Sequence, residues 1–341
     1  MTTQVLELTD ESLKKAAEII REGGLVGIPT ETVYGLGADA LNEAAVRSIF
    51  AAKGRPADNP LIVHICDLTQ IKELITGEMP ENAVKLANAF WPGPMTMIFP
   101  KAEVVPMVTT GGLDTVAVRF PSHPAAQKLI RWSGKMIAAP SGNRSGRPSP
   151  TCAWHMLEDM DGIIPLILDG GVCDVGVEST VIDVTCDPVR VLRPGGITPE
   201  MIRDVLGSVA VDESLMRPLK TDEKPRSPGM KYRHYAPKGN VTIVRGSAEN
   251  VQKKIIELYD ADDRKKAVLA LEGHIAAYGD RRVISLGADA RGMAHTLFDA
   301  LRRADEEGIE VMYSEAVAAD GIGLAVMNRL GRAAAFNVIE V

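Results

Sequence analysis

Hydrophobic positions in the first two hundred residues follow two alternating periods, one typical of helices and one typical of short strands. Apolar residues spaced three or four apart after Asp10 predict a helix that Asp10 caps and Gly23-Gly24 ends. The same spacing predicts helices over 44–52, 82–90 and 198–207. Short apolar runs predict strands over 25–28, 61–63, 95–99, 114–120, 136–139, 163–168 and 179–184. This pattern indicates an α/β domain, and its irregular spacing favours a twisted mixed sheet.

The pattern becomes regular after residue 240. Apolar runs predict strands over 241–244, 267–271, 283–286 and 310–313, and amphipathic segments predict helices over 248–258, 291–304 and 322–335. This order is typical of a small Rossmann-like domain, although no GxGxxG motif follows its first strand. We therefore expect a first domain over 1–208, a linker over 209–240 and a Rossmann-like domain over 241–341.

Bulk composition narrows the class of protein. The 341 residues are 45% hydrophobic and 24% charged, which is ordinary for a soluble globular protein. The net charge of −7 argues against a general electrostatic affinity for nucleic acid. The four cysteines form no CxxC pair, and the chain has neither an N-terminal signal pattern nor a run of about 20 apolar residues. We expect a reduced, cytoplasmic protein without structural zinc.

Two dense blocks of polar and glycine residues follow predicted strands. The first is PTETVYGLG at 29–37 and the second is KGRPADNPLIVH at 53–64. We expect both to form loops at strand edges that face one cleft, where glycine lets backbone N–H groups approach an anion. Lys53 and Arg55, with Asn59 and His64 behind them, suit a phosphate; the alternatives are a solvated basic turn and a packed histidine.

Hydroxyl groups and arginines elsewhere could complete such a site. Thr30, Thr32 and Tyr34 suit a small polar pocket, or are ordinary strand-end residues. Arg119 stands in an apolar run, where it needs either a substrate carboxylate or an ion pair with an acid such as Glu178. The loop from Ser141 to Ser149 offers many donors for a polyphosphate, or is a flexible surface loop. Ser179 and Thr180 could line the same cleft, and Arg193 is either part of it or a surface charge.

Six segments together resemble the YrdC/Sua5 family of L-threonylcarbamoyladenylate synthases. They are PTETVYGLG, KGRPADNPLIVHI, WPGPMT, VAVRFPSHP, APSGNRSGRPSPT and GVESTVID, which span about half of the chain. The resemblance implies a YrdC-like catalytic domain followed by the C-terminal domain of the longer Sua5 type. It implies a nucleotidyltransferase that makes threonylcarbamoyl-AMP and pyrophosphate from L-threonine, bicarbonate (or CO2) and ATP, for the t6A37 modification of tRNA.

The resemblance also implies two sets of binding residues. Those expected around L-threonine are Thr32, His64, Arg119, Ala139 and Ser179. Those expected around ATP are Arg55, Asn59, Thr115, Ser141, Ser149, Arg193 and, from the linker, Tyr235. Lys53 and Asn143 lie in the same motifs and are added as phosphate candidates, with Lys53 and Arg55 as charge stabilisers. No covalent or acid–base residue is expected.

The expected partners follow from this reaction. Mg²⁺ would arrive on the ATP phosphates without a protein metal cage, and the product would pass to a tRNA threonylcarbamoyl transferase. The linker segment PGMKYRHYAP would form a lid that excludes water from a labile intermediate. A different class of function is an RNA-binding or ribosome-maturation module, whose basic concave surface would use Lys53, Arg55, Arg119, Arg144 and Arg193. Weak tRNA binding is also compatible with the synthase activity.

Overall fold

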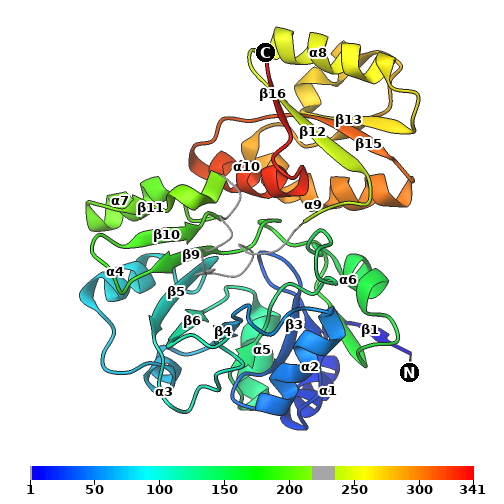
Figure 1. The fold of residues 1–341 in the computed structure, drawn as a ribbon. Coiled ribbons are helices and arrows are strands. Elements are labelled where there is room, and N and C mark those ends of the chain that lie inside the picture. The colour runs from blue at the N-terminus through cyan, green and yellow to red at the C-terminus, as the bar shows by residue number, and fades with distance from the viewer. Residues whose placement is uncertain (1, 217–234) are drawn as a thin grey trace. The chain divides into compact units, whose positions relative to one another are not determined.

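The chain folds into two compact units (Figure 1). A computed structural model describes residues 2–216 and 235–341. Within these residues, unit 1 contains 2–145 and 149–215, and unit 2 contains 146–148 and 235–341. Most of the expected lid, up to residue 234, lies outside the described residues. Among the described helices, none has the length and apolar character needed to cross a membrane.

Unit 1 is built on a large mixed sheet. Its described strands number eleven and lie in the order β1-β8-β2-β3-β7-β4-β6-β5-β9-β10-β11. The strands are β1 Gln4–Glu7, β2 Val26–Ile28, β3 Gly35–Asp39, β4 Ile62–His64, β5 Met95–Pro100, β6 Thr115–Arg119, β7 Ile137–Ala138, β8 Leu166–Asp169, β9 Thr180–Asp183, β10 Arg190–Arg193 and β11 Ala210–Val211. The helices are α1 Asp10–Arg21, α2 Glu43–Lys53, η1 Leu68–Gln70, α3 Ile71–Leu74, α4 Glu81–Phe90, α5 Pro124–Ser133, α6 Ala153–Met160, α7 Pro199–Leu206 and η2 Glu213–Met216.

The sheet separates two hydrophobic cores in unit 1. Helices α1 and α5 pack on one face, where Ile20 and Leu129 are buried against Leu166 of β8. The larger core contains residues of α2, α4 and α6 together with the alternate side chains of the central strands, such as Val63 and Val118. A third, smaller apolar cluster includes Ile62 and Ala117, which alternate with these residues and therefore point to the other face of β4 and β6.

The α/β class and the twisted mixed sheet are confirmed, but two local expectations were wrong. The cap of α1 is Thr9 and not Asp10. The Thr9 hydroxyl accepts a hydrogen bond from the Ser12 N–H, and the Ser12 hydroxyl accepts one from the Thr9 N–H. The end of the first motif block is also a strand, β3, rather than a loop. It pairs antiparallel with β2, and a Cβ on Gly37 would lie 2.1 Å from the Ile28 Cδ1 atom, so glycine leaves room for the Ile28 side chain.

Unit 2 is a parallel sheet with helices on both faces, as the regular pattern after residue 240 predicted. The described strands lie in the order β14-β13-β15-β12-β16, and all of their pairings are parallel. They are β12 Asn240–Arg245, β13 Lys266–Ala270, β14 Val283–Ser285, β15 Val311–Glu315 and β16 Val338–Glu340, the last unpredicted. Helix α8 (Ala248–Ala261) covers one face, while α9 (Ala290–Glu306) and α10 (Gly321–Ala333) pack together on the other; η3 spans Glu272–Tyr278 (Figure 1).

Candidate functional site

Five neighbouring strands of unit 1 bring candidate residues into one row across the sheet. His64 ends β4 and lies opposite Arg119, which ends β6; Arg119 in turn lies opposite Thr96 of β5. The row continues through Val181 of β9 to Arg193 of β10. Directly opposed residues place their side chains on the same face of a sheet. Residues that are far apart in sequence therefore meet through strand register.

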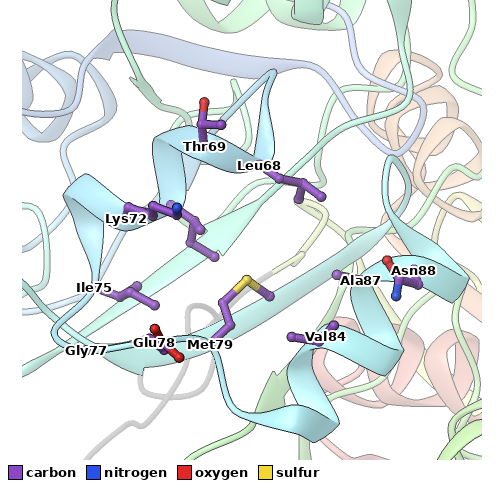
Figure 2. A pocket seen from close by; sticks show the side chains of 11 residues that line it. Leu68, Thr69, Lys72, Ile75, Gly77, Glu78, Met79, Val84, Ala87 and Asn88 are labelled. Atoms are coloured by element: carbon purple, nitrogen blue, oxygen red, sulfur yellow. The ribbon is translucent and has the colours of Figure 1, made fainter.

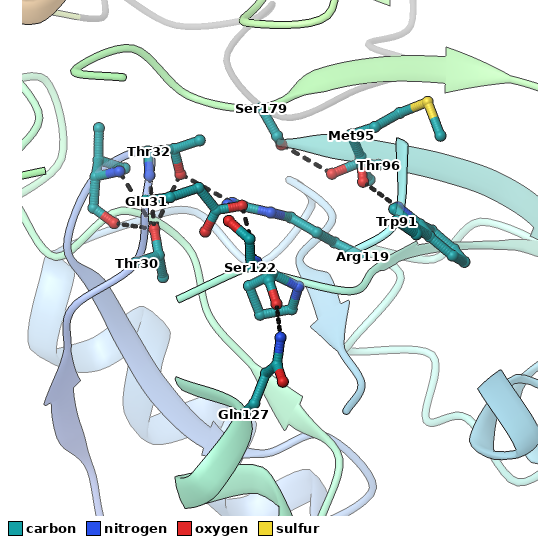
Figure 3. Close-up of polar contacts among 12 residues, drawn as sticks. Thr30, Glu31, Thr32, Trp91, Met95, Thr96, Arg119, Ser122, Gln127 and Ser179 are labelled. Atoms are coloured by element: carbon teal, nitrogen blue, oxygen red, sulfur yellow. Dashed lines mark hydrogen bonds and ion pairs between the residues drawn. The ribbon is translucent and has the colours of Figure 1, made fainter. Parts of the chain in front are cut away.

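Arg119 is held by two residues of the first motif block (Figure 3). Its Nη1 atom donates to the Thr32 hydroxyl at 2.9 Å, and its Nη2 atom lies 2.8 Å from the Glu31 carboxylate. The side chains of Arg119 and Glu31 are only 5% and 6% exposed. The Thr32 hydroxyl also lies 3.0 Å from the Thr30 hydroxyl. The ion-pair partner of Arg119 is thus Glu31, and not Glu178 as the sequence had suggested.

The row is electrostatically asymmetric. Burial, together with the positive charge of Arg119, lowers the pKa of His64 to about 3, so its ring is neutral at physiological pH. Its Nδ1 atom lies 3.2 Å from the Ile62 carbonyl. Burial tends to raise the pKa of Glu31. The charge of Arg119 and the hydrogen bond from the Ser122 N–H together outweigh burial, so the net shift of this pKa is downward. Glu31 and Arg119 therefore form a charged pair beside a neutral imidazole.

Ser179 links the row to the end of β10. Its hydroxyl lies 2.8 Å from the Thr96 hydroxyl and accepts a hydrogen bond from Arg193 Nη2 at 3.1 Å. Arg193 Nε donates to the Ser179 carbonyl at 3.0 Å, so its guanidinium fixes both the backbone and the side chain of Ser179. Ala139 lies on the other flank, where its N–H donates to the Ile62 carbonyl at 3.1 Å. The five residues predicted to bind L-threonine therefore all lie at or beside the ends of β4, β6, β7 and β9.

A second group lies at the opposite ends of β4 and β6. Thr115 begins β6, four residues before Arg119 and therefore about 13 Å away at 3.3 Å per residue. Arg55 Nη2 donates to the Pro60 carbonyl at 3.1 Å. Asn59 is 1% exposed, and neither its amide nitrogen nor its amide oxygen has a hydrogen-bond partner within the described residues. Arg55 and Asn59 precede β4 and Thr115 begins the parallel strand β6, so these predicted nucleotide residues lie toward the same edge of the sheet, opposite to His64 and Arg119.

Lys53 holds the loop after β7 in place through hydrogen bonds to its backbone. Its ammonium donates to the carbonyls of Ser141 and Asn143, and its own carbonyl accepts from the Ser145 N–H at 2.9 Å. Ser149 closes the loop with a 2.5 Å hydrogen bond from its hydroxyl to Glu178. In this structure, Lys53 therefore supports the loop through its backbone.

Tyr235 is the one predicted site residue that belongs to unit 2. Its ring stacks on Phe298 of α9, with ring centroids 5.2 Å apart, and it is 5% exposed. It has a positive φ of 62°, a conformation that non-glycine residues seldom adopt. Its expected contact with the nucleotide stays a prediction from the resemblance.

Sequence reasoning missed two residues of the row. Glu31 was not assigned a role, although an acid in a motif of glycine, threonine and apolar residues was a visible signal. Thr96 was expected only as part of a strand, although it ends the WPGPMT segment that carries part of the family resemblance. Both are buried and contact predicted threonine-site residues, which a sequence alone could not show.

A hollow of about 560 Å³ lies in unit 1, away from these residues (Figure 2). It is bordered by η1, α3 and α4 and lined mainly by apolar side chains such as Ile75, Met79 and Val84. None of the predicted site residues lines it. Within residues 2–216 and 235–341, no group of three or more His, Cys, Asp or Glu side chains is placed to hold a metal ion.

Two protein-family models match successive parts of this chain. The Sua5–YciO–YrdC model, described as telomere recombination, matches residues 18–195. The model described as the C-terminal domain of threonylcarbamoyl-AMP synthase matches residues 197–335.

Full-length relatives are similar over both units. The threonylcarbamoyl-AMP synthase of Pyrococcus abyssi is 50% identical, with 96% of each chain covered. That of Bacillus subtilis is 48% identical, with 99% of this chain and 97% of the relative covered. The crystal structure of P. abyssi Sua5 complexed with L-threonine matches with a TM-score of 0.94 at 48% identity, covering 99% of this chain and all of that one.

Proposed function

We infer the activity of this protein from its family, because the chain belongs to the Sua5–YciO–YrdC family and matches two-domain members over nearly their full length. It is a threonylcarbamoyl-AMP synthase, a nucleotidyltransferase. It condenses L-threonine, bicarbonate or CO2, and ATP to threonylcarbamoyl-AMP and pyrophosphate, for the t6A37 modification of tRNA. The observation that carries this conclusion is the 50% identity to the P. abyssi synthase over 96% of both chains.

The threonine end of the proposed site is the row around Arg119. Arg119 Nε and Nη2 make no hydrogen bond within the described residues, and together they form one edge of the guanidinium. Such an edge suits a carboxylate that accepts two parallel hydrogen bonds. We therefore assign the substrate carboxylate to Arg119. Thr32, His64, Ala139 and Ser179 would surround the rest of the amino acid. The crystal structure of P. abyssi Sua5 complexed with L-threonine supports L-threonine as the ligand.

The nucleotide end would lie toward the other ends of β4 and β6. Buried polar atoms without partners, such as the amide of Asn59, cost free energy that a ligand can offset, which supports ATP beside Arg55, Asn59 and Thr115. The loop held by Lys53 would contribute Ser141, Asn143 and Ser149, and Arg193 and Tyr235 complete the proposed set. Carbamate formation and its attack on the α-phosphate then depend mainly on holding the reactants together and stabilising charge.

The remaining partners belong to the proposal. Mg²⁺ bound to the triphosphate with mostly water ligands would neutralise phosphate charge, which requires few protein ligands. The product would pass to a tRNA threonylcarbamoyl transferase. A cytoplasmic location agrees with the four free cysteines, since reducing compartments keep thiols reduced.

Burial of basic residues weakens the alternative proposal of an RNA-binding surface. It relied on five basic residues, but Lys53, Arg119 and Arg193 are each at most 7% exposed. Their donors contact backbone carbonyls, hydroxyls and Glu31. A filter-binding titration with unmodified tRNA across salt would measure any weak binding that remains.

The test of the activity is pyrophosphate release from ATP. Release should require both L-threonine and bicarbonate, and release that is equal when either is omitted would reject the function. Arg119→Lys keeps the charge but loses the planar fork, so the KM for L-threonine should rise about tenfold or more while the KM for ATP stays near its original value. The exposed Arg47 on α2 offers the matched control Arg47→Lys, which should change neither constant.

A further inference from the structure

The ion pair between Glu31 and Arg119 has hydrogen-bonding capacity that the protein itself does not use. Glu31 Oε1 accepts from the Ser122 N–H at 3.2 Å and lies 2.8 Å from Arg119 Nη2. Glu31 Oε2, Arg119 Nε and Arg119 Nη2 are buried and have no hydrogen-bond partner in the described part of the chain. The ion pair between Glu31 Oε1 and Arg119 Nη2 neutralises both charges and leaves these three atoms available to a ligand.

These three atoms form a matched set. Buried polar atoms in folded proteins nearly always have partners, so three unpaired atoms in one buried pair point to a missing ligand. Two of the atoms are donors on one guanidinium edge, and the third is an acceptor on the neighbouring carboxylate. An α-amino acid offers the complement, because its carboxylate accepts two hydrogen bonds and its adjacent ammonium donates.

We propose that Glu31 binds the α-ammonium group of the amino-acid substrate through Oε2, while Arg119 binds the substrate carboxylate through Nε and Nη2. This assignment rests on the proposed function, since it deepens the same site. It makes Glu31 the residue that selects an amino acid over an acid of the same shape that lacks the amine.

The charges of the surrounding residues agree with this assignment. Glu31 and Arg119 sum to zero, and Thr32, Thr96 and Ser179 contribute neutral hydroxyls. His64 is neutral as well, because burial and the charge of Arg119 lower its pKa. A zwitterion, which also has no net charge, enters such a site without leaving an uncompensated buried charge.

The experiment compares two ligands on the full-length protein by calorimetric titration. The ligands are L-threonine and (R)-3-hydroxybutanoate, which keeps the carboxylate, hydroxyl and methyl groups but lacks the amine. The wild type should bind L-threonine at least tenfold more tightly. Glu31→Gln keeps the size of the side chain and removes the charge, so its affinity for L-threonine should fall at least tenfold. Its affinity for (R)-3-hydroxybutanoate should stay the same or increase.

Two further variants separate recognition from folding. Glu31→Asp keeps the carboxylate and should keep most of the preference for L-threonine. Asp39→Asn alters another buried carboxylate, one that pairs with Lys135 at 3.0 Å, and should change neither affinity.

Three outcomes would overturn the assignment. These are equal affinity of the wild type for the two ligands, an unchanged preference in folded Glu31→Gln, and a parallel loss of both ligands in Glu31→Gln, which is the result of a purely structural role. Failure of the proposed function itself would look different, because the wild type would then bind no L-threonine at all. The wild-type comparison keeps the proposal testable even if Glu31→Gln does not fold.

Discussion

At the scale of single residues, burial separates side chains that complete the fold from side chains that wait for a ligand. Lys53 and Ser149 are buried, and their polar groups are hydrogen-bonded within unit 1. Asn59 is equally buried, but its amide has no hydrogen-bond partner in the described residues. A buried amide left in this state costs free energy, so its presence is best explained by what it binds.

Asn59→Ala tests this explanation. The variant removes two potential hydrogen bonds to ATP, so the KM for ATP should rise about tenfold. The KM for L-threonine should not change, because Arg119 and its neighbours lie at the other end of β6. Steady-state pyrophosphate release gives both constants. Asn88→Ala, at an exposed position of α4, is the matched control, and an unchanged KM for ATP in Asn59→Ala would contradict the assignment.

His64 predicts a pH dependence of stability. Its pKa is lowered to about 3 in the folded protein, whereas an unfolded chain takes up this proton near pH 6.5. The unfolded state therefore binds more protons between these values, so the stability from this residue is complete above pH 6.5 and falls as pH falls. At pH 5 the loss is about 2 kcal/mol.

Urea unfolding at pH 7.5 and pH 5 measures this loss. His64→Gln cannot take up the proton, so its unfolding free energy should fall by about 2 kcal/mol less than that of the wild type over the same interval. Other titrating groups affect both proteins alike and cancel in the comparison. Equal losses in the two proteins would show that His64 is protonated without cost in the folded state.

At the scale of elements, close backbone approaches fix where the site residues lie. Gly195 follows β10 and rests against the segment that leads into β9. A Cβ atom there would lie 2.4 Å from the Thr180 nitrogen and 2.5 Å from the Glu178 carbonyl oxygen. Because both neighbours are backbone atoms, they can yield only if the start of β9, including Ser179, moves.

Gly195→Ala should therefore affect stability and substrate binding together. We expect a loss of about 1–3 kcal/mol in the unfolding free energy of unit 1 and a higher KM for L-threonine. Gly196→Ala is the control, since a Cβ there would meet only side-chain atoms of Pro94 and Val175 at 3.3 Å. Denaturant unfolding and pyrophosphate kinetics on both variants make the comparison. A Gly195→Ala enzyme that matches Gly196→Ala would disprove the steric argument.

The elements also show what could be predicted from sequence. Most helices were predicted correctly because their apolar residues repeat over several turns and glycine or threonine marks their ends, as at Gly207 and Thr198. Strand β3 was missed because glycine is depleted in strands, and the close approach of Gly37 to the Ile28 side chain of β2 is a tertiary contact that forms only on folding. The partner of Arg119 was missed for the same kind of reason: Glu31 lies 88 positions away and meets Arg119 only in the folded unit.

At the scale of the whole molecule, the two units have separate cores and separate sheets. All six residues proposed to contact L-threonine, Glu31 included, lie in unit 1. A ligand stabilises only what it binds in the folded state, by about 2.7 kcal/mol at a concentration one hundred times its Kd. We therefore expect L-threonine to act unequally on the two units.

Scanning calorimetry of the full chain tests this expectation. L-threonine should raise the temperature of the transition that belongs to unit 1 and leave that of unit 2 unchanged. Leu297→Ala, which truncates a fully buried side chain of α9, should lower the unit 2 transition and so identify it. A single transition that L-threonine shifts as a whole would show that the units unfold together.

The row from His64 to Arg193 has a consequence for how such enzymes diversify. Its members stand on strands, so insertions or deletions in the connecting loops of unit 1 leave their spacing intact. Descendants of this chain can vary the loops that hold no substrate residue and still choose the same amino acid, whereas the segment between β2 and β3 has to keep Glu31 and Thr32 in place. A new amino-acid preference has to come from exchanging side chains within the row or at Glu31.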